Sequence, residues 1–196
     1  MGIETRAPLQ HWNYFLSIED DVARLARYVE PTESNFACHS IELARVLFAA
    51  ASEVDVVLKQ LCEKLDPNCR ASSINTYRSV IFSTFPGLES YVVTVPRFGL
   101  TLTPWESWHE GSSPLWWTAY NKVKHRRHTH FEEACLKHAL NGVAALFLVL
   151  LLFYREEAMG GLLSPDPSLF CAGPPFFVDR HVWGDQGKTY RIIGKT

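Results

Sequence analysis

Apolar residues recur every three or four positions through much of the chain, a spacing typical of amphipathic helices. This spacing predicts an N-terminal helix over 17–30 and a longer helix over 36–65. A third helix is expected over 72–85, because the turn-forming pair Pro86-Gly87 follows it directly. The N-terminal half is therefore expected to be helical.

Side-chain caps indicate where two helices begin. Ser17 with Asp20 three residues later resembles a capping box at the start of the first helix, and Thr129 with Glu132 forms a second one. From the second box an apolar helix is expected to continue to Tyr154. Because that helix is apolar on all sides over 144–153, it is expected to lie at the centre of the fold.

Between these helices the pattern changes to β-branched and alternating residues. The segments 91–95 and 100–103 predict a short hairpin, interrupted at 96–99. Ser113 before Pro114 then predicts a helix over 114–127, with Ser113 as its N-cap.

In the C-terminal part, 160–196, frequent glycine and proline residues interrupt the helical spacing of apolar residues. A second hairpin is expected from 176–178 and 190–193, on either side of a turn at 184–187. We interpret this tail as an appendage or a strap rather than as a second domain. The predicted fold is a single domain over 1–196: a mainly α-helical, antiparallel bundle with a short β-hairpin and a β-prone tail.

Composition narrows the class of protein. A chain of 196 residues fits one domain, and a content of 47% hydrophobic and 20% charged residues excludes a disordered protein. The net charge of −2 points to neither a nucleic-acid nor a membrane partner, so such a partner would need a local patch of charge.

Cysteine usage and hydropathy indicate the compartment. Five cysteines without a Cys-x-x-Cys pair are typical of reduced thiols. No secretory leader is recognisable, and the apolar run over 143–154 is shorter than the ~20 residues of a spanning helix. We therefore expect a cytoplasmic protein without a membrane partner.

One segment departs from the average charge. No acidic residue lies between Glu110 and Glu132, whereas four cations and three imidazoles fall there: Lys122, Lys124, Arg126, Arg127, His125, His128 and His130. Helical spacing predicts one stripe of Trp116, Tyr120, Val123 and Arg127, which can dock Trp116 and Val123 into the bundle. The neighbouring stripe contains Trp117, Asn121, Lys124, His125 and His128. A phosphate-bearing ligand would need such a basic face, although cations also favour a helix C-terminus for its dipole alone.

The run Tyr120-Asn121-Lys122-Val123-Lys124-His125, followed by two arginines and a long apolar helix, resembles the signature region of the HEPN superfamily. That signature is an arginine, then a polar residue, then a few positions, then histidine. Asn121 and His125 match it, whereas Tyr120 occupies the place of the arginine. The resemblance covers a helical core at about 35–155, and the wider pattern is similar to a group of uncharacterised bacterial HEPN-like proteins.

The resemblance implies an RNA-binding protein and a metal-independent endoribonuclease with a toxin or defence role, in which two copies form the cleft. His125 would be the general acid or base and Asn121 would position the phosphate or His125. RNA and its phosphates would be bound by Lys122, Lys124, Arg126, Arg127, His128, Tyr120 and Trp117. A homodimer and an antitoxin or other protein partner are expected, without a cofactor or metal. The alternative is a catalytically inactive module that binds a partner protein or a nucleotide.

Three further interpretations stay open at this point. His125, His128 and His130 could ligate zinc, but no cysteine or carboxylate completes the set. Asp55 could pair with Lys59, or Asp55 or Glu53 could hold His125 in one tautomer.

Four tryptophans lead into the basic helix: Trp105, Trp108, Trp116 and Trp117. They are expected to form a packed lid, from which Trp117 could instead stack on a base.

Overall fold

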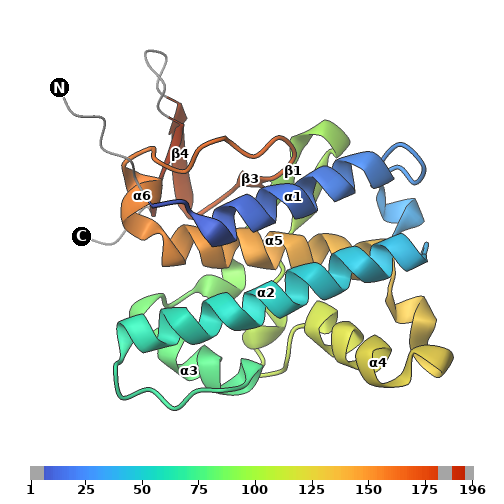
Figure 1. Cartoon of the computed structure of the whole chain (residues 1–196), viewed down its shortest axis with the longest axis horizontal. Helices are drawn as coiled ribbons and strands as arrows, with labels where there is room; N and C mark the ends of the chain where they lie inside the picture. The colour runs from blue at the N-terminus through green and yellow to red at the C-terminus, as the bar shows by residue number, and fades with distance from the viewer. Residues whose placement is uncertain (1–6, 181–186, 193–196) are drawn as a thin grey trace.

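The computed structural model describes residues 7–180 and 187–192, and this part of the chain is mainly α-helical with two small antiparallel sheets (Figure 1). The helices of the described part are α1 (Gln10–Leu25), α2 (Ile41–Leu65), α3 (Ile74–Thr84), α4 (Leu115–His130), α5 (Leu136–Phe153) and α6 (Arg155–Met159). The predicted mainly helical fold class is confirmed at this level.

Helix α5 is the centre of the fold. It runs along α2, and both α1 and α4 pack against this pair (Figure 1). Its only residues that are not buried are Lys137, His138, Asn141 and Phe153. The helix is long and apolar enough to cross a membrane, but 78% of it is buried inside the molecule, as in the core helix of a soluble protein.

Two serines set the starts of α2 and α3. Ser40 Oγ accepts a hydrogen bond from the Leu43 amide at 3.1 Å, so α2 begins at Ile41 rather than at 36. At α3, Ser73 and Thr76 form a reciprocal capping box. The predicted helix over 72–85 is therefore confirmed to within two residues at its start and one at its end.

The N-terminal helix lies earlier than predicted, at Gln10–Leu25 instead of 17–30. Ser17 is not its cap, because the helix is already formed there and Ser17 Oγ donates to the Asn13 carbonyl. The stripe that decides its position begins with Trp12 and Phe15, which are fully buried. Val29 lies within the predicted range but follows the helix.

The junction between α4 and α5 also differs from the prediction. Thr129 lies in the last turn of α4 and donates to the Arg126 carbonyl, so it caps no helix. A short 3₁₀ turn at Phe131–Glu133 follows, and α5 begins only after Cys135. The N-cap of α4 is Pro114, whereas Ser113 donates to Asn75 of α3 at 2.9 Å.

The first sheet contains the predicted hairpin, β1 (Val93–Val95) and β2 (Leu100–Leu102), with Thr94 opposite Thr101. A third strand, β3 (Cys171–Ala172), pairs with the other edge of β1 and was not predicted. The chain therefore returns from the C-terminal part to the hairpin.

The second sheet confirms the predicted C-terminal hairpin. Its strands are β4 (Phe176–Arg180) and β5 (Lys188–Ile192), with Val178 opposite Tyr190. Of the turn expected at 184–187, only Gly187 belongs to the described residues, and position 193 also lies outside them.

The tail is joined to α1 through a buried carboxylate. Glu19 is 2% exposed and accepts hydrogen bonds from the amides of Ser168, Leu169 and Phe170 at 2.8–3.0 Å. Residues of α1 and of the tail, such as Phe15 and Phe170, belong to the same hydrophobic core as α2 and α5. Both ends of the described chain thus contribute to the core.

Candidate functional site

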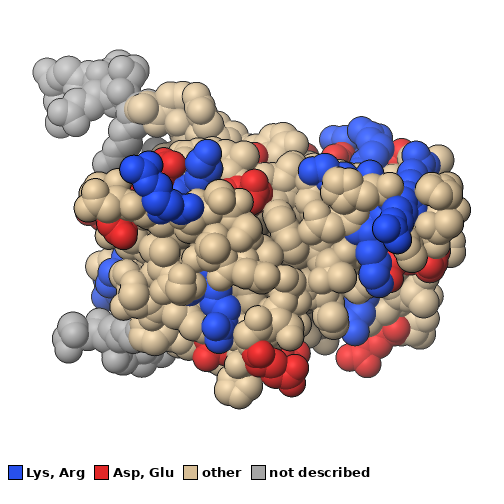
Figure 2. Space-filling view, turned by 90° about the horizontal axis from the view of Figure 1, so that it is seen from below, with Lys and Arg blue, Asp and Glu red and all other residues tan. Residues whose placement is uncertain are grey.

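The candidate site is the outer face of α4. Six of its residues are exposed: Lys122, Lys124, His125, Arg126, Arg127 and His128. Val123, which lies between the first two in sequence, is buried. Seen from below, Lys and Arg side chains gather over the end of the molecule where α4 lies, with acidic side chains at the margin (Figure 2). The carboxylate-free segment is thus a basic surface, which we call the α4 basic face and define by these six residues.

The opposite side of α4 holds the helix in place. Trp116, Tyr120 and Val123 are 1%, 7% and 1% exposed, which confirms the predicted docking of Trp116 and Val123. Arg127 of the same predicted stripe is exposed, because α4 is kinked at Arg126. The Tyr120 ring lies edge-on to Phe48 of α2 at 5.4 Å between centroids. Its hydroxyl lies 3.2 Å from Lys124 Nζ, so Tyr120 accepts a hydrogen bond from a cation of the face.

The cations of the face differ in their partners. Lys122 forms an ion pair with Glu133, which the 3₁₀ turn after α4 brings back to the helix. By contrast, no carboxylate of the described chain lies within ion-pair distance of Lys124, Arg126 or Arg127. These three charges are the ones available to an anion.

The backbone changes direction within the basic face. Arg126 has non-helical angles (φ −142°, ψ 46°), so α4 is kinked there. Arg127 lies over the Phe131 ring at 5.0 Å, a cation–π contact that holds its guanidinium near the surface. The two neighbouring arginines are therefore not consecutive residues of one regular helix.

The predicted catalytic pair is not hydrogen-bonded. Asn121 Nδ2 donates to the Trp117 carbonyl at 3.0 Å, and its Oδ1 has no partner among the described residues. His125 takes part in no hydrogen bond or ion pair within the described residues. In a single chain, Asn121 does not orient His125.

The carboxylates that were expected to hold His125 lie elsewhere. Glu53 contacts His11 of α1, with 2.5 Å between Oε1 and Nδ1. Burial, followed by the charge and hydrogen bonding of Asp55, raises the pKa of Tyr77, so Asp55 faces that hydroxyl. Both versions of the Asp55 interpretation are therefore wrong, since neither Lys59 nor His125 is its ion-pair partner among the described residues.

A groove of about 470 Å³ lies beside the basic face, between α4, α2 and the start of α3. Four predicted site residues line it: Trp117, Tyr120, Asn121 and Lys124. The facing wall includes Asp55 and Ser73. The structure thus brings part of the predicted stripe together around a concave surface, whereas His125 and His128 do not line it.

The tryptophan lid is confirmed for three residues. Trp105, Trp108 and Trp116 are at most 1% exposed, and Trp105 lies 4.3 Å from Trp108 between ring centroids. Trp117 is only partly buried and lines the groove, so its ring remains available to a ligand.

A second group of reactive side chains was missed by the sequence analysis. His138 Nδ1 lies 2.9 Å from the Glu133 carbonyl and 3.5 Å from Cys135 Sγ. Burial raises the pKa of the Cys135 thiol, but hydrogen bonds with the His138 side chain and backbone outweigh it and leave the pKa below its usual value. The available signal was the spacing of Cys135 and His138, three residues apart at the start of a helix.

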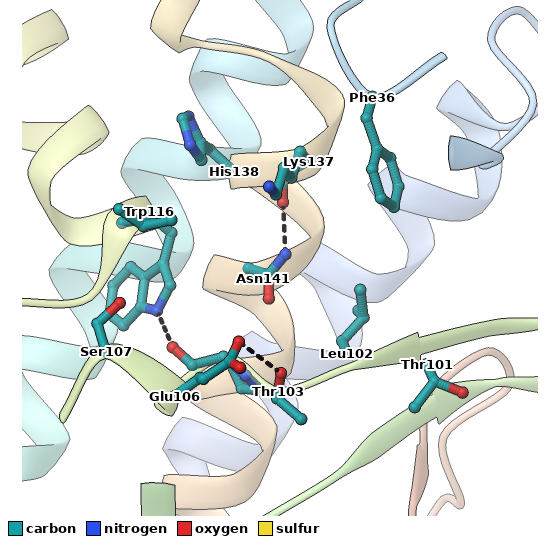
Figure 3. A pocket seen from close by; sticks show the side chains of 12 residues that line it. Phe36, Thr101, Leu102, Thr103, Glu106, Ser107, Trp116, Lys137, His138 and Asn141 are labelled. Carbon is teal, nitrogen blue, oxygen red and sulfur yellow. Dashed lines mark hydrogen bonds between the residues drawn. The ribbon is translucent and has the colours of Figure 1, made fainter. Parts of the chain in front are cut away.

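Next to this group is a small polar pocket of about 160 Å³ between α5 and the segment after β2 (Figure 3). Asn141 and Lys137 of α5 face Thr103 and Glu106 across it (Figure 3). Trp116 closes one side, because its Nε1 donates to the Pro104 carbonyl at 2.8 Å.

The described residues include no group of three His, Cys, Asp or Glu side chains placed to hold a metal ion, so the three-histidine zinc interpretation gains no support. Comparisons with protein-family models, with curated proteins and with solved structures found no match. The function therefore has to be inferred from the chain's own residues.

Proposed function

We propose that this chain is a HEPN-like RNA-binding protein that contacts RNA through the α4 basic face. The observation that carries the proposal is the set of three exposed cations without a carboxylate partner in the described chain, Lys124, Arg126 and Arg127. They lie beside a groove with a partly exposed tryptophan. Positive charge next to an aromatic surface is the combination that single-stranded nucleic acid requires.

The chemistry of the three cations favours phosphate as the ligand. A guanidinium offers a planar fork of N–H donors that fits two phosphate oxygens, and Arg126 and Arg127 supply two forks at the kink of α4. Lys122 contributes less, because Glu133 already compensates its charge. His128 adds a further donor on the same exposed surface.

We extend the proposal to metal-independent RNA cleavage. The 2′-hydroxyl of RNA would attack the adjacent phosphate, with His125 as the general acid or base, since an imidazole exchanges protons near neutral pH. Because Asn121 does not contact His125 within one chain, the cleft would be completed by a second copy in a homodimer. The resemblance adds a cytoplasmic toxin or defence role and an antitoxin or other protein partner.

One observation favours the alternative, a catalytically inactive module that binds a protein or a nucleotide. Tyr120 stands where the family has an arginine, and it is buried between Phe48 and Trp117. It therefore presents no charge to a phosphate in the transition state.

Binding is tested with a labelled single-stranded RNA over a range of salt concentrations. The double variant Arg126→Ala/Arg127→Ala should reduce the slope of log affinity against log salt by about 1.4, because about 0.7 is lost per phosphate contact. Lys122→Ala is the matched control and should change the slope much less, because that ammonium is paired with Glu133. Equal effects of both variants, or no salt-dependent binding by the wild type, would contradict the proposal.

Cleavage is tested by incubating the protein with total RNA in the presence of a chelator. Activity in the wild type that disappears in His125→Ala supports the ribonuclease. Salt-dependent RNA binding without cleavage would support the RNA-binding function alone. Absence of cleavage together with the capture of a partner protein would support the inactive alternative.

A further inference from the structure

The groove between α2, α3 and α4 contains an acidic group on an otherwise basic side of the molecule. Asp55 of α2 lines this groove opposite Asn121 and Lys124 of α4. It is half-buried, and no cation of the described chain forms an ion pair with it. Such a carboxylate lies in a concave site without a compensating charge, so it is suited to bind a ligand that donates hydrogen bonds.

The polar atoms that line the groove define what that ligand must present. The Asp55 carboxylate only accepts hydrogen bonds, and beside the one from the Tyr77 hydroxyl it can accept others. Asn121 Oδ1 has no hydrogen-bond partner within the described residues. Lys124 Nζ only donates. The groove therefore offers two acceptors and one cationic donor, and a matching ligand has two adjacent donors and one acceptor.

Among the four RNA bases, only guanine has this pattern on its Watson–Crick edge. Its N1–H and N2–H are adjacent donors, with O6 as the acceptor next to them. Adenine and cytosine each place a single donor group beside a ring acceptor, and uracil places one donor between two acceptors. We propose that this groove binds a guanine base, with Asp55 accepting from N1–H and one N2–H, Asn121 Oδ1 accepting from the other N2–H, Lys124 donating to O6 and Trp117 stacking on the ring.

Trp117 supplies the face that a base requires. It is partly exposed, and its ring is supported edge-on by Trp116 at 5.8 Å and by the tilted ring of Tyr120 at 5.3 Å between centroids. Stacking of this kind does not distinguish between bases. The distinction therefore has to come from Asp55 and Asn121.

Charge also determines which part of a nucleotide enters. Asp55 repels a phosphate, so the base occupies the groove, while the phosphates lie along α4 toward Arg126 and Arg127. The volume of about 470 Å³ falls within the roughly 300–1,000 Å³ of small-molecule sites. For RNA as the source of the guanine, the inference rests on the proposed function, whereas a free guanine nucleotide would need only the groove.

The test uses the full-length wild-type chain and labelled nine-nucleotide RNAs: oligouridine with a central guanosine, with inosine, with adenosine or with uridine. Equilibrium dialysis of GMP and AMP is run in parallel. The guanosine oligonucleotide should bind roughly tenfold tighter than the others, the gain expected from one good bidentate contact to a base. Inosine lacks the 2-amino group and should lose most of that preference, a comparison that requires no variant.

Variants then locate the preference. Asp55→Asn should abolish the preference for guanine but not the salt-dependent binding of oligouridine, whereas Tyr77→Phe retains the carboxylate and should retain the preference. Trp117→Ala should lower the affinity for every oligonucleotide, and Trp117→Phe should retain part of the affinity that the alanine variant loses. Circular dichroism confirms that each variant is folded.

The outcomes separate the two proposals. Salt-dependent RNA binding without a preference for guanine would overturn the guanine site and leave the proposed function standing. GMP binding that depends on Asp55, without RNA binding, would support the site and contradict the RNA function. If neither GMP nor the guanosine oligonucleotide is preferred, the inference is wrong.

Discussion

Glu133 contacts two chemically active side chains from different helices. Its carboxylate forms an ion pair with Lys122 of α4 and lies 3.7 Å from His138 Nδ1 of α5. Its carbonyl accepts from the same His138 nitrogen, which directs the ring toward Cys135. Although burial lowers the pKa of His138, these contacts raise it above the usual value. The result is a thiol with a lowered pKa beside an imidazole with a raised one.

This arrangement predicts the pH dependence of alkylation at Cys135. The thiolate is the reacting species, so a lowered pKa moves the midpoint of the rate–pH curve to lower pH than for the same cysteine in the urea-unfolded chain. His138→Ala removes the compensating hydrogen bond and leaves burial, so the midpoint should move up. The measurement is iodoacetamide labelling followed by peptide mass spectrometry.

Cys62 provides an internal control in the same labelling experiment. Burial, with smaller contributions from Cys69 and Glu63, raises its pKa to about 12, so it should remain unlabelled in the folded chain at neutral pH. Identical midpoints for Cys135 in the folded and unfolded chains would contradict the assignment.

At the scale of elements, the packing of α5 on α2 depends on small residues. Gly142 of α5 faces Leu47 and Ala50 of α2, and a Cβ added there would lie 3.4 Å from Leu47 Cδ1 and 3.6 Å from Ala50 Cβ. Those distances are ordinary van der Waals contacts. There is room for one methyl group and no more.

Gly142→Ala is therefore expected to stabilise the protein, by about 0.5–1 kcal/mol, because alanine has the higher helix propensity. Gly142→Leu should destabilise it by about 1–3 kcal/mol, because the larger side chain overpacks the interface. Urea denaturation of the two variants measures both changes in the free energy of unfolding. A destabilised alanine variant would mean that the two helices approach more closely than described.

The sequence predicted the presence of helices and strands better than the residues at which they begin and end. Apolar periodicity located α2 and α3, and β-branched residues located both hairpins. Ser17 and Thr129 were misleading because each hydrogen-bonds a carbonyl of its own helix, a choice that local sequence does not reveal. The strand β3 was missed because two residues carry no alternating pattern.

The candidate site was predictable as a stretch of sequence but not as a set of contacts. Helical spacing correctly separated buried Val123 from exposed Lys124, but it placed Arg127 on the buried stripe because the kink at Arg126 was not predictable. The position of Asp55 in the groove and the pairing of Glu133 with Lys122 depend on how helices meet, which one sequence does not contain.

At the scale of the whole molecule, Glu19 joins elements about 150 residues apart. Its buried carboxylate satisfies three backbone amides of the tail, and α1 shares the core with α2 and α5. A buried carboxylate is tolerated when donors surround it in this way.

Glu19→Ala should lower the free energy of unfolding by about 3 kcal/mol or more, since it leaves buried amides without an acceptor. Asp20→Ala is the matched control and should have little effect, because Asp20 is exposed and its ion pair with Arg24 lies on the surface. Urea denaturation of both variants gives the comparison. If both variants lost a similarly small part of the free energy of unfolding, contacts other than those of Glu19 would hold the tail.

The sharing of the core between both ends of the described chain has a practical consequence for dissection. A fragment limited to 35–155, the region that carries the family resemblance, would lack α1, β3 and the second hairpin. It would present to water the faces of Phe147 that now stack on Phe15 and meet Tyr190 edge-on. Such a fragment is expected to aggregate on expression, so loss of RNA binding in it would reflect loss of folding and not the removal of a binding surface.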